Sequence, residues 1–303
     1  MISAYTPILR RPSANSAPWY NRFHSVFYLS QLTSQLFTSY LESGIENDKK
    51  EMIAELEPEL IQAKIVRKNV ETGGVQILKE EKLKSRHIED TINRIIEGVF
   101  LCNQDETEMY LTAMGLAARD RQKKEINIDQ NQLLNATTSK NWYELISGLL
   151  NVWEFIFLYG AVESAFKEIL KKEGQTREED LLTEVLDQFE EFSGDADVDI
   201  NNIQKIWLFF TEMRNIYVHN HGRINGRIKS NLGGKLDDFK KAIVNMHAGS
   251  IMITDLEEIL KNSRVKNEKF YFLRTPELNI FRNSMVHLLE CLDESKLKQT
   301  GEC

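Results

Sequence analysis

The sequence has few of the residues that interrupt helices or cross-link chains. It contains five prolines, 15 glycines and three cysteines in 303 residues. Because proline and glycine are scarce, long helices are favoured and an all-β fold is excluded. The cysteines, Cys102, Cys291 and Cys303, are odd in number and lack Cys-x-x-Cys spacing. The sequence therefore predicts neither a disulfide framework nor a thiolate zinc site, and we expect a cytoplasmic protein.

The sequence also lacks an excess of positive charge. It has 38 Lys and Arg residues against 46 Asp and Glu residues, a net charge of −8. The field of the whole molecule therefore does not attract nucleic acid, and any such contact must be local. The first 18 residues have no apolar core and hold three prolines. They do not resemble a signal peptide, so we expect no export.

Apolar residues at helical spacing predict an all-α protein. A polar stretch at 127–140 is the expected boundary between an N-terminal helical region (1–140), for sensing, dimerisation or regulation, and a helical-bundle domain (141–303). At most a few short strands are expected near the C-terminus, at 250–254 and 269–273, and a basic loop at 223–235. Helices are predicted at 19–42, 46–70, 79–103, 106–121, 142–172, 177–192, 199–221, 236–246 and 276–298.

The segment 142–172 is apolar nearly all round. A helix of this kind lies either in a membrane or at the centre of a bundle. Asn151 and Glu154 would be costly in lipid, and no basic cluster flanks the start of the segment. We therefore predict the central helix of a bundle and no membrane partner.

Known metal and phosphate motifs are incomplete in this chain. The acidic run at 195–199 lacks the glycine and the closing glutamate of an EF-hand loop. The Gly-Gly-Lys at 233–235 is not followed by Ser or Thr, so it is no phosphate loop. His219 and His221 lack further ligands at a recurrent zinc spacing. We expect no metal and no cofactor.

One group of polar residues stands out, in the sequence RNIYVHNHG at 214–222. On a helical wheel Arg214 falls within about 40° of Ile203 and Phe210, inside an apolar stripe where an unpaired guanidinium is costly. Asn215 and His219 are four residues apart and share a face about 120° from Arg214, on the opposite edge of the helix end. Arginine at such a place indicates a specific role.

This segment resembles the signature of the HEPN superfamily, an Arg, usually followed by Asn, with four to six residues before a His near a helix end. Arg214, Asn215 and His219 match the form RNxxxHNxG, and His221 would match with six intervening residues. The preceding apolar helix, with Glu163 inside it, resembles the second core helix of the family. The resemblance covers about residues 142–249 and leaves 1–140 unexplained.

The resemblance implies a metal-independent endoribonuclease that acts as a homodimer, with the two motifs meeting across the interface. Arg214, Asn215 and His219 would be catalytic, with His221 and Glu163 as secondary candidates. Histidine titrates near neutrality and can move a proton of the RNA 2′-hydroxyl or of the leaving oxygen. The resemblance suggests a toxin, abortive-infection or phage-defence role, with an antitoxin or regulatory partner. Arg223 and Arg227, which follow the motif, are the expected RNA-binding residues.

Other interpretations of the same residues stay open. Arg214 could pair with a buried carboxylate, Glu163 or Glu154, while Asn215 and His219 only cap the helix. The domain would then be a non-catalytic module that binds a nucleotide, RNA or a partner protein. A small-molecule enzyme is a third option without any cofactor motif. A second Arg-Asn-x-x-x-His at 282–287 is interpreted as chance, because the wheel turns His287 toward solvent.

Overall fold

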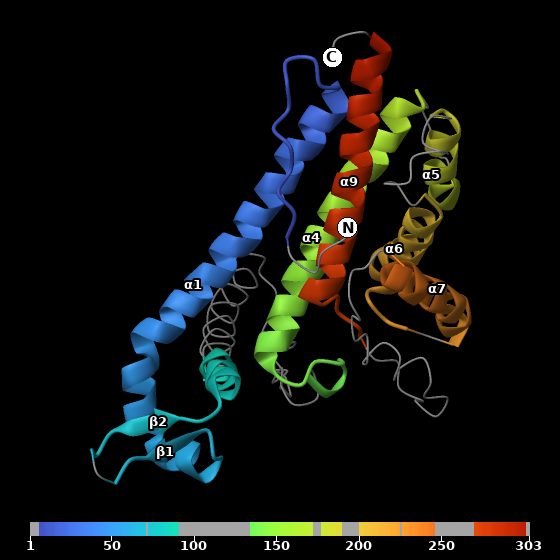
Figure 1. Cartoon of the computed structure of the whole chain (residues 1–303). Helices are drawn as coiled ribbons and strands as arrows, with labels where there is room; N and C mark the ends of the chain where they lie inside the picture. The colour runs from blue at the N-terminus through green and yellow to red at the C-terminus, as the bar shows by residue number, and fades with distance from the viewer. Residues whose placement is uncertain are drawn as a thin grey trace, which may run out of the picture. The chain divides into compact units, whose positions relative to one another are not determined.

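The computed structural model describes residues 6–70, 72–90, 134–171, 177–189, 200–224, 226–245 and 270–300. These residues are predominantly helical, and their one sheet pairs two three-residue strands, so the all-α prediction is confirmed (Figure 1). The helices are α1 (Pro18–Gln62), α4 (Trp142–Ile169), α5 (Glu178–Asp187), α6 (Ile200–Asn220), α7 (Gly226–Asn245) and α9 (Thr275–Thr300).

The chain forms two compact units. The first comprises residues 1–37, 136–138 and 147–303, and the second comprises 38–135 and 139–146. The expected boundary near residue 140 does not coincide with this division. The reason is that Trp19, Tyr20, Phe23 and Phe27, on the first turns of α1, are buried in the core of the first unit.

Aromatic side chains from α4, α6 and α9 meet at the centre of the first unit. The ring of Phe155 on α4 lies 5.5 Å from Phe210 on α6 and 5.0 Å from Phe281 on α9. Tyr159 stacks on Trp207 of α6 at 4.7 Å. These three helices were predicted at nearly these positions, because each has a continuous apolar stripe that only another helix can cover.

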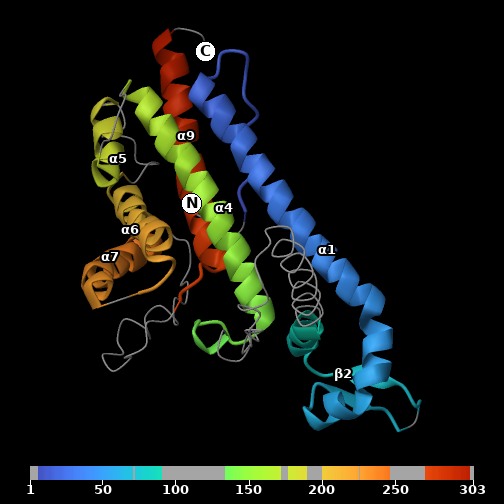
Figure 2. The ribbon, with the colours of Figure 1, turned by 180° about the vertical axis from the view of Figure 1, so that it is seen from behind.

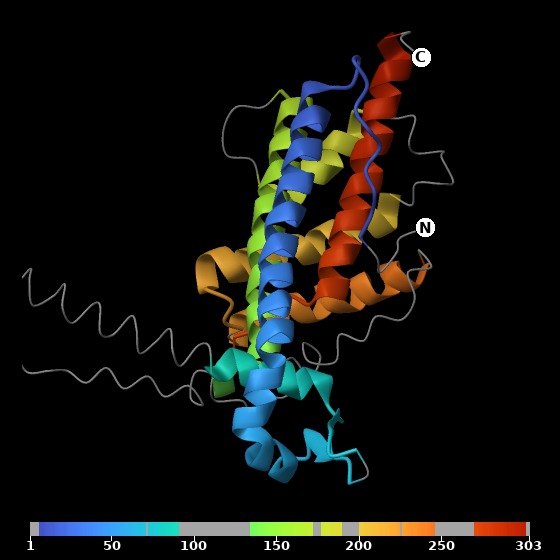
Figure 3. The ribbon, with the colours of Figure 1, turned by 90° about the vertical axis from the view of Figure 1, so that its left-hand side faces the viewer.

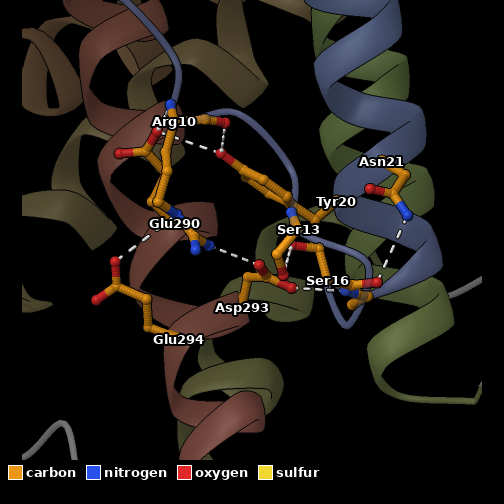
Figure 4. A network of polar contacts seen from close by, with 9 residues as sticks. Arg10, Ser13, Ser16, Tyr20, Asn21, Glu290, Asp293 and Glu294 are labelled. Carbon is orange, nitrogen blue, oxygen red and sulfur yellow. Dashed lines mark hydrogen bonds and ion pairs between the residues drawn. The ribbon is translucent and has the colours of Figure 1, made fainter. Parts of the chain in front are cut away.

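The residues that precede α1, 6–17, form an N-terminal arm that binds α9 through polar contacts (Figure 4). Asp293, fully buried on α9, accepts hydrogen bonds from the Arg10 guanidinium at 2.6 Å and from the backbone N–H of Ala17 at 2.7 Å. Because Ala17 immediately precedes α1, the carboxylate also places negative charge at the helix N-terminus, where it is favourable. Tyr20 on α1 also binds the arm, because its hydroxyl donates a hydrogen bond to the backbone carbonyl of Arg10.

Two predictions about the helices are wrong. Helices were expected at 19–42 and 46–70, but α1 is continuous over both until Gln62 (Figure 2). The single Gly44 between them costs only about 1 kcal/mol, too little to end a helix that is otherwise sound. From Gly226 on, the expected loop at 223–235 is instead the first half of α7, because Ile228, Leu232 and Leu236 already give a buried helical stripe.

The strands also differ from the expectation. In the second unit β1 (Val66–Lys68) pairs antiparallel with β2 (Val75–Ile77) (Figure 3). Gly73 in the intervening turn adopts φ +67°. Near the C-terminus, Phe270 makes only single-residue bridges, to Thr137 and Arg223. The strand expected at 250–254 and the helices expected at 106–121 and beyond residue 90 lie outside the described residues, as does the acidic run at 195–199.

The second unit has its own small core. Val66 of β1 packs with Met52 and Leu60 from the end of α1 and with Leu83 from the helical residues 80–90. Ile88 and Trp142 form another apolar contact within the unit.

Candidate functional site

The HEPN-like sequence lies at the C-terminal end of α6. This helix forms because Ile203, Ile206, Phe210 and Met213 recur at helical spacing and are fully buried. His221 and Gly222 then adopt positive φ of 52° and 80°, and the N–H of Gly222 donates to the carbonyl of Ile216 at 3.0 Å. Left-handed residues directly after the last turn are a common way to end a helix, and this hydrogen bond reaches back six positions, one more than in the Schellman motif. α6 ends at Asn220, one residue after His219, and His219 in this last turn is exposed to solvent.

Arg214, Asn215 and His219 meet at this helix end. One guanidinium nitrogen of Arg214, Nη1, donates to Oδ1 of Asn215 at 3.1 Å and lies 3.3 Å from Nε2 of His219. The helical wheel placed Arg214 on the opposite edge from the other two. The long arginine side chain bridges that separation, so the three groups form one cluster.

The cluster is open to solvent, and the contact between Arg214 and His219 has a defined donor and acceptor. His219 is exposed, and Arg214 and Asn215 are half-buried. A guanidinium carries only hydrogen-bond donors, so the contact with His219 requires a lone pair on Nε2. The imidazole nitrogen nearest the arginine is therefore the one that can accept a proton. A cation and a proton acceptor side by side at an open helix end are suited to bind a phosphate and act on a neighbouring hydroxyl.

The residues that follow the cluster extend its positive character. His221 is exposed in the turn after α6. Arg223 is also exposed, and its guanidinium lies over the ring of Phe270, 4.7 Å from the centroid. This stack fixes a planar cation within a few residues of His219. Arg227 lies in the first turn of α7, and its side chain is outside the part of the structure that is described.

The two carboxylates considered as partners of Arg214 have other partners. Glu163 on α4 forms an ion pair with Lys167 one turn later, at 2.5 Å. Glu154 is buried and binds Arg282 of α9 through both Nε and Nη2. Among the contacts that the structure describes, Glu163 therefore binds Lys167 and not the Arg214 cluster. Glu154 lies in another part of the core, at Arg282.

The second Arg-Asn-x-x-x-His sequence, at 282–287, is built differently. Arg282 is buried between Glu154 and Asn279, whose Oδ1 accepts from Nη1 at 2.5 Å. The prediction that His287 points to solvent is wrong, because its Nε2 is buried and has no hydrogen-bond partner in the described part of the chain. The reason is that α9 is enclosed on most sides, so a wheel drawn for one apolar stripe underestimates its burial.

Sequence reasoning missed a buried acid beneath the end of α6. Glu277, in the first turn of α9, accepts hydrogen bonds from the Tyr271 hydroxyl at 2.6 Å and from the backbone N–H of Arg274 at 3.0 Å. Burial raises the pKa of Glu277, although both hydrogen bonds oppose the shift. Burial and then the charge of Glu277 also raise the pKa of Tyr217, a residue of the motif itself. Glutamate one position after a helix-starting proline was the available signal.

Two further findings bear on function. Among the described residues, no group of three or more His, Cys, Asp or Glu side chains is placed to hold a metal ion. The helix α4 is long and apolar enough to cross a membrane by length and composition, and 44% of its apolar window is buried in the protein.

Comparison of the chain with protein-family models, with curated proteins and with solved structures finds no match. The resemblance to the HEPN superfamily therefore rests on the residues at 214–222 and on the helix that precedes them.

Proposed function

We propose that the chain is a metal-independent endoribonuclease and that the Arg214 cluster is its catalytic site. One observation supports this most directly: Nη1 of Arg214 lies 3.3 Å from Nε2 of His219 at an exposed helix end. A guanidinium matches the geometry of a phosphodiester, and an imidazole can exchange a proton near neutral pH. The HEPN resemblance adds the expectation that these groups act together on RNA.

In the proposed reaction Arg214 binds the scissile phosphate. Its guanidinium then turns from His219 toward the phosphate oxygens, which frees the lone pair of Nε2. The imidazole takes the proton of the 2′-hydroxyl, and the 2′-oxygen forms a bond to phosphorus while the bond to the 5′-oxygen breaks. The 5′-oxygen receives a proton, so the products are a 2′,3′-cyclic phosphate and a 5′-hydroxyl. Asn215 holds the guanidinium through its Oδ1.

A single histidine does not readily remove one proton and supply another in the same step. The HEPN resemblance implies a homodimer in which the second copy contributes the other imidazole, and we include this composite site in the proposal. His221 is the other candidate for the acid, since it lies two residues beyond His219. Arg223 and Arg227 would bind the flanking phosphates. The same resemblance underlies the proposed cytoplasmic role in toxin, abortive-infection or phage defence, with an antitoxin or regulatory partner.

The test is incubation of the purified chain with a mixed RNA pool in EDTA, followed by analysis of the product ends. We expect cleavage that leaves 2′,3′-cyclic phosphate, and none of DNA, which lacks the 2′-hydroxyl. Arg214→Ala and His219→Ala should lose cleavage by at least about 10²-fold and keep their fold. Arg11→Ala, which removes an exposed guanidinium elsewhere, is the matched control. Undiminished cleavage by both site variants would exclude this assignment.

The alternative is a non-catalytic module that binds a nucleotide or RNA. The stack of Arg223 on Phe270 favours it, because a planar cation beside an aromatic ring can hold an unpaired base without any chemistry. In that case Arg214→Ala weakens binding of a fluorescent oligoribonucleotide, and the wild-type chain leaves the oligoribonucleotide intact.

A further inference from the structure

The helices α1 and α4 carry an exposed apolar face in the first unit. Trp153 exposes 75% of its surface, Leu29 56% and Phe157 51%, values unusual for side chains of this size. We call this surface the α1–α4 face; its exposed large residues are Leu29, Leu32, Leu36, Phe37, Leu149, Trp153 and Phe157.

The two helices lie antiparallel where the face is formed. Figure 2 shows the opposite chain directions of α1 and α4. Arg22 near the start of α1 forms an ion pair with Glu168 near the end of α4. Val26 then lines a groove of about 600 Å³ together with the α4 residues Trp153, Ile156, Phe157, Gly160 and Ala161. A Cβ added at Gly160 would meet nothing within 4 Å, so the floor of the groove is open there.

The spacing of these residues is that of a helix–helix seam. On α1 the groove residue Val26 is followed by Leu29 and Leu36, and on α4 Leu149 is followed by Trp153, Ile156 and Gly160. The intervals are three and seven residues on α1 and three and four on α4, which place each set on one stripe of its helix, as at the core positions of a coiled coil. Two such stripes side by side form half of a four-helix arrangement.

The face is also free of charge. No Asp, Glu, Lys or Arg lies between Arg22 and Glu42 in the sequence. Between Glu144 and Glu163 the only charged residue is Glu154, which is buried and paired with Arg282. An uncharged apolar surface bounded by charged residues is typical of an interface rather than of a solvated face.

We propose that a second copy of this chain docks on the α1–α4 face, so that the two pairs of helices form a four-helix bundle. The face is self-complementary: it carries a projecting Trp153 and, two turns later on the same stripe, the open floor at Gly160. A two-fold contact requires both features on one surface, because each copy then seats its Trp153 in the groove of the other.

Area and charge both support a second copy as the occupant. The exposed parts of the seven large residues amount to roughly 800 Å², the area that each partner buries in a standard stable interface. Copies with a net charge of −8 repel each other, and this uncharged face is where they can meet without opposing charges of one sign. The same charge disfavours an anionic lipid surface, which attracts basic residues that this face does not have.

This contact is separate from the one implied for the ribonuclease site. Phe155 and Tyr159 alternate with Trp153 and Phe157 along α4 and pack against Phe210 and Trp207 of α6. The α1–α4 face and α6 therefore lie on opposite sides of α4. A copy can use both surfaces. The variants Arg214→Ala and His219→Ala should therefore lose RNA cleavage but associate through the α1–α4 face as the wild-type chain does.

The experiment is sedimentation equilibrium of the full chain and of three variants. Docking through this face alone gives the wild-type chain twice its 35.2 kDa mass, and use of both surfaces gives a larger assembly. Trp153→Glu removes the projecting ring, and Gly160→Leu fills the groove; each should weaken the dimer by about 30-fold or more. Val244→Glu, which puts the same charge on an exposed apolar position of α7, should remain dimeric.

Thermal unfolding separates loss of docking from loss of fold. Because a side chain at Gly160 is sterically free and favours helix, Gly160→Leu should unfold at no lower temperature than the wild-type chain when both are monomeric. A wild-type chain that stays monomeric at 100 μM would overturn the proposal, as would a dimer that neither variant weakens. Binding of the monomer to phosphatidylcholine–phosphatidylglycerol vesicles, abolished by Trp153→Glu, would assign the face to lipid instead.

Discussion

The chain contains the sequence Arg-Asn-x-x-x-His twice, and the two copies occupy opposite environments. At 214–219 the arginine is half-buried and contacts the asparagine and histidine of its own motif. At 282–287 the arginine is buried and contacts Glu154 and Asn279 instead, while His287 is half-buried and its Nε2 is buried. The same residue types at the same spacing therefore make a cluster open to solvent in one case and an internal ion pair in the other.

The difference follows from where each helix ends. The first motif occupies the last turns of α6, and the left-handed residues His221 and Gly222 end the helix directly after it. The second motif begins seven residues into α9, a helix that runs on to Thr300 and has buried residues along it as far as Asp293. Spacing fixes only how three side chains stand relative to one helix axis. The end of that helix and the elements around it decide whether the side chains stay open to solvent and contact one another, as at 214–219, or are buried against other residues, as Arg282 is.

The largest expected effect comes from breaking the buried pair. Arg282→Met should lower the free energy of unfolding by about 3–5 kcal/mol, because Glu154 is left buried without its cation. Arg214→Met, in the open cluster, should cost less than about 1 kcal/mol. Urea denaturation of both variants measures the contrast. Adding Glu154→Leu to Arg282→Met should recover much of the loss, and equal costs for the two arginines would contradict the difference in burial.

The next effect concerns the two histidines. His219→Ala should reduce RNA cleavage by at least about 10²-fold, while His287→Ala should leave cleavage within about two-fold. The two variants remove the same group from the same motif position, so each is the control for the other. Initial rates on one fluorescent oligoribonucleotide in EDTA are sufficient. If His287→Ala proved to be the inactive variant, the site would have to be sought in α9.

Much of this arrangement was predictable from the sequence, and the rest was not for a physical reason. The central helices α4, α6 and α9 each carry a long apolar stripe, and the motif at the end of α6 is visible as polar residues after such a stripe. The pairing of Arg282 with Glu154 joins residues 128 positions apart, and that of Arg10 with Asp293 joins residues 283 positions apart. A helical wheel compares positions on one helix only, so it left open a pairing of Arg214 with Glu154, which binds Arg282 instead.

A smaller effect concerns the acid buried near the first motif. Glu277 is held there by hydrogen bonds, whereas the buried carboxylate at the second motif, Glu154, forms an ion pair. Because the pKa of Glu277 is raised in the folded protein, the folded state binds its proton more tightly than the unfolded state. Glu277 therefore favours folding below its unfolded pKa, near 4.5, and this contribution is lost as the pH rises through the folded value. Relative to Glu277→Gln, the wild-type chain should lose stability as the pH rises above about 4.5. Thermal melts between pH 4 and 8 measure the difference, and a constant gap would show that the acid is not titrating there.

The smallest effect concerns the ion pairs that join α6 to α5 and α7 through Lys235. Lys235 of α7 binds Glu179 of α5 at 2.7 Å and Glu212 of α6 at 3.1 Å, two residues before Arg214. Burial alone would lower the pKa of Lys235, but the two carboxylates outweigh it and raise the pKa, so the cation is present throughout the neutral range. Because the group is partly exposed, Lys235→Met should lower the free energy of unfolding by only about 0.5–1 kcal/mol, and by less in 1 M salt.

The destabilisation by Arg282→Met should hardly change with salt, since a buried pair is screened far less than an exposed one. Urea denaturation of both variants at low and high salt measures this contrast, and an equal salt dependence would mean that the two ion pairs are similarly solvated.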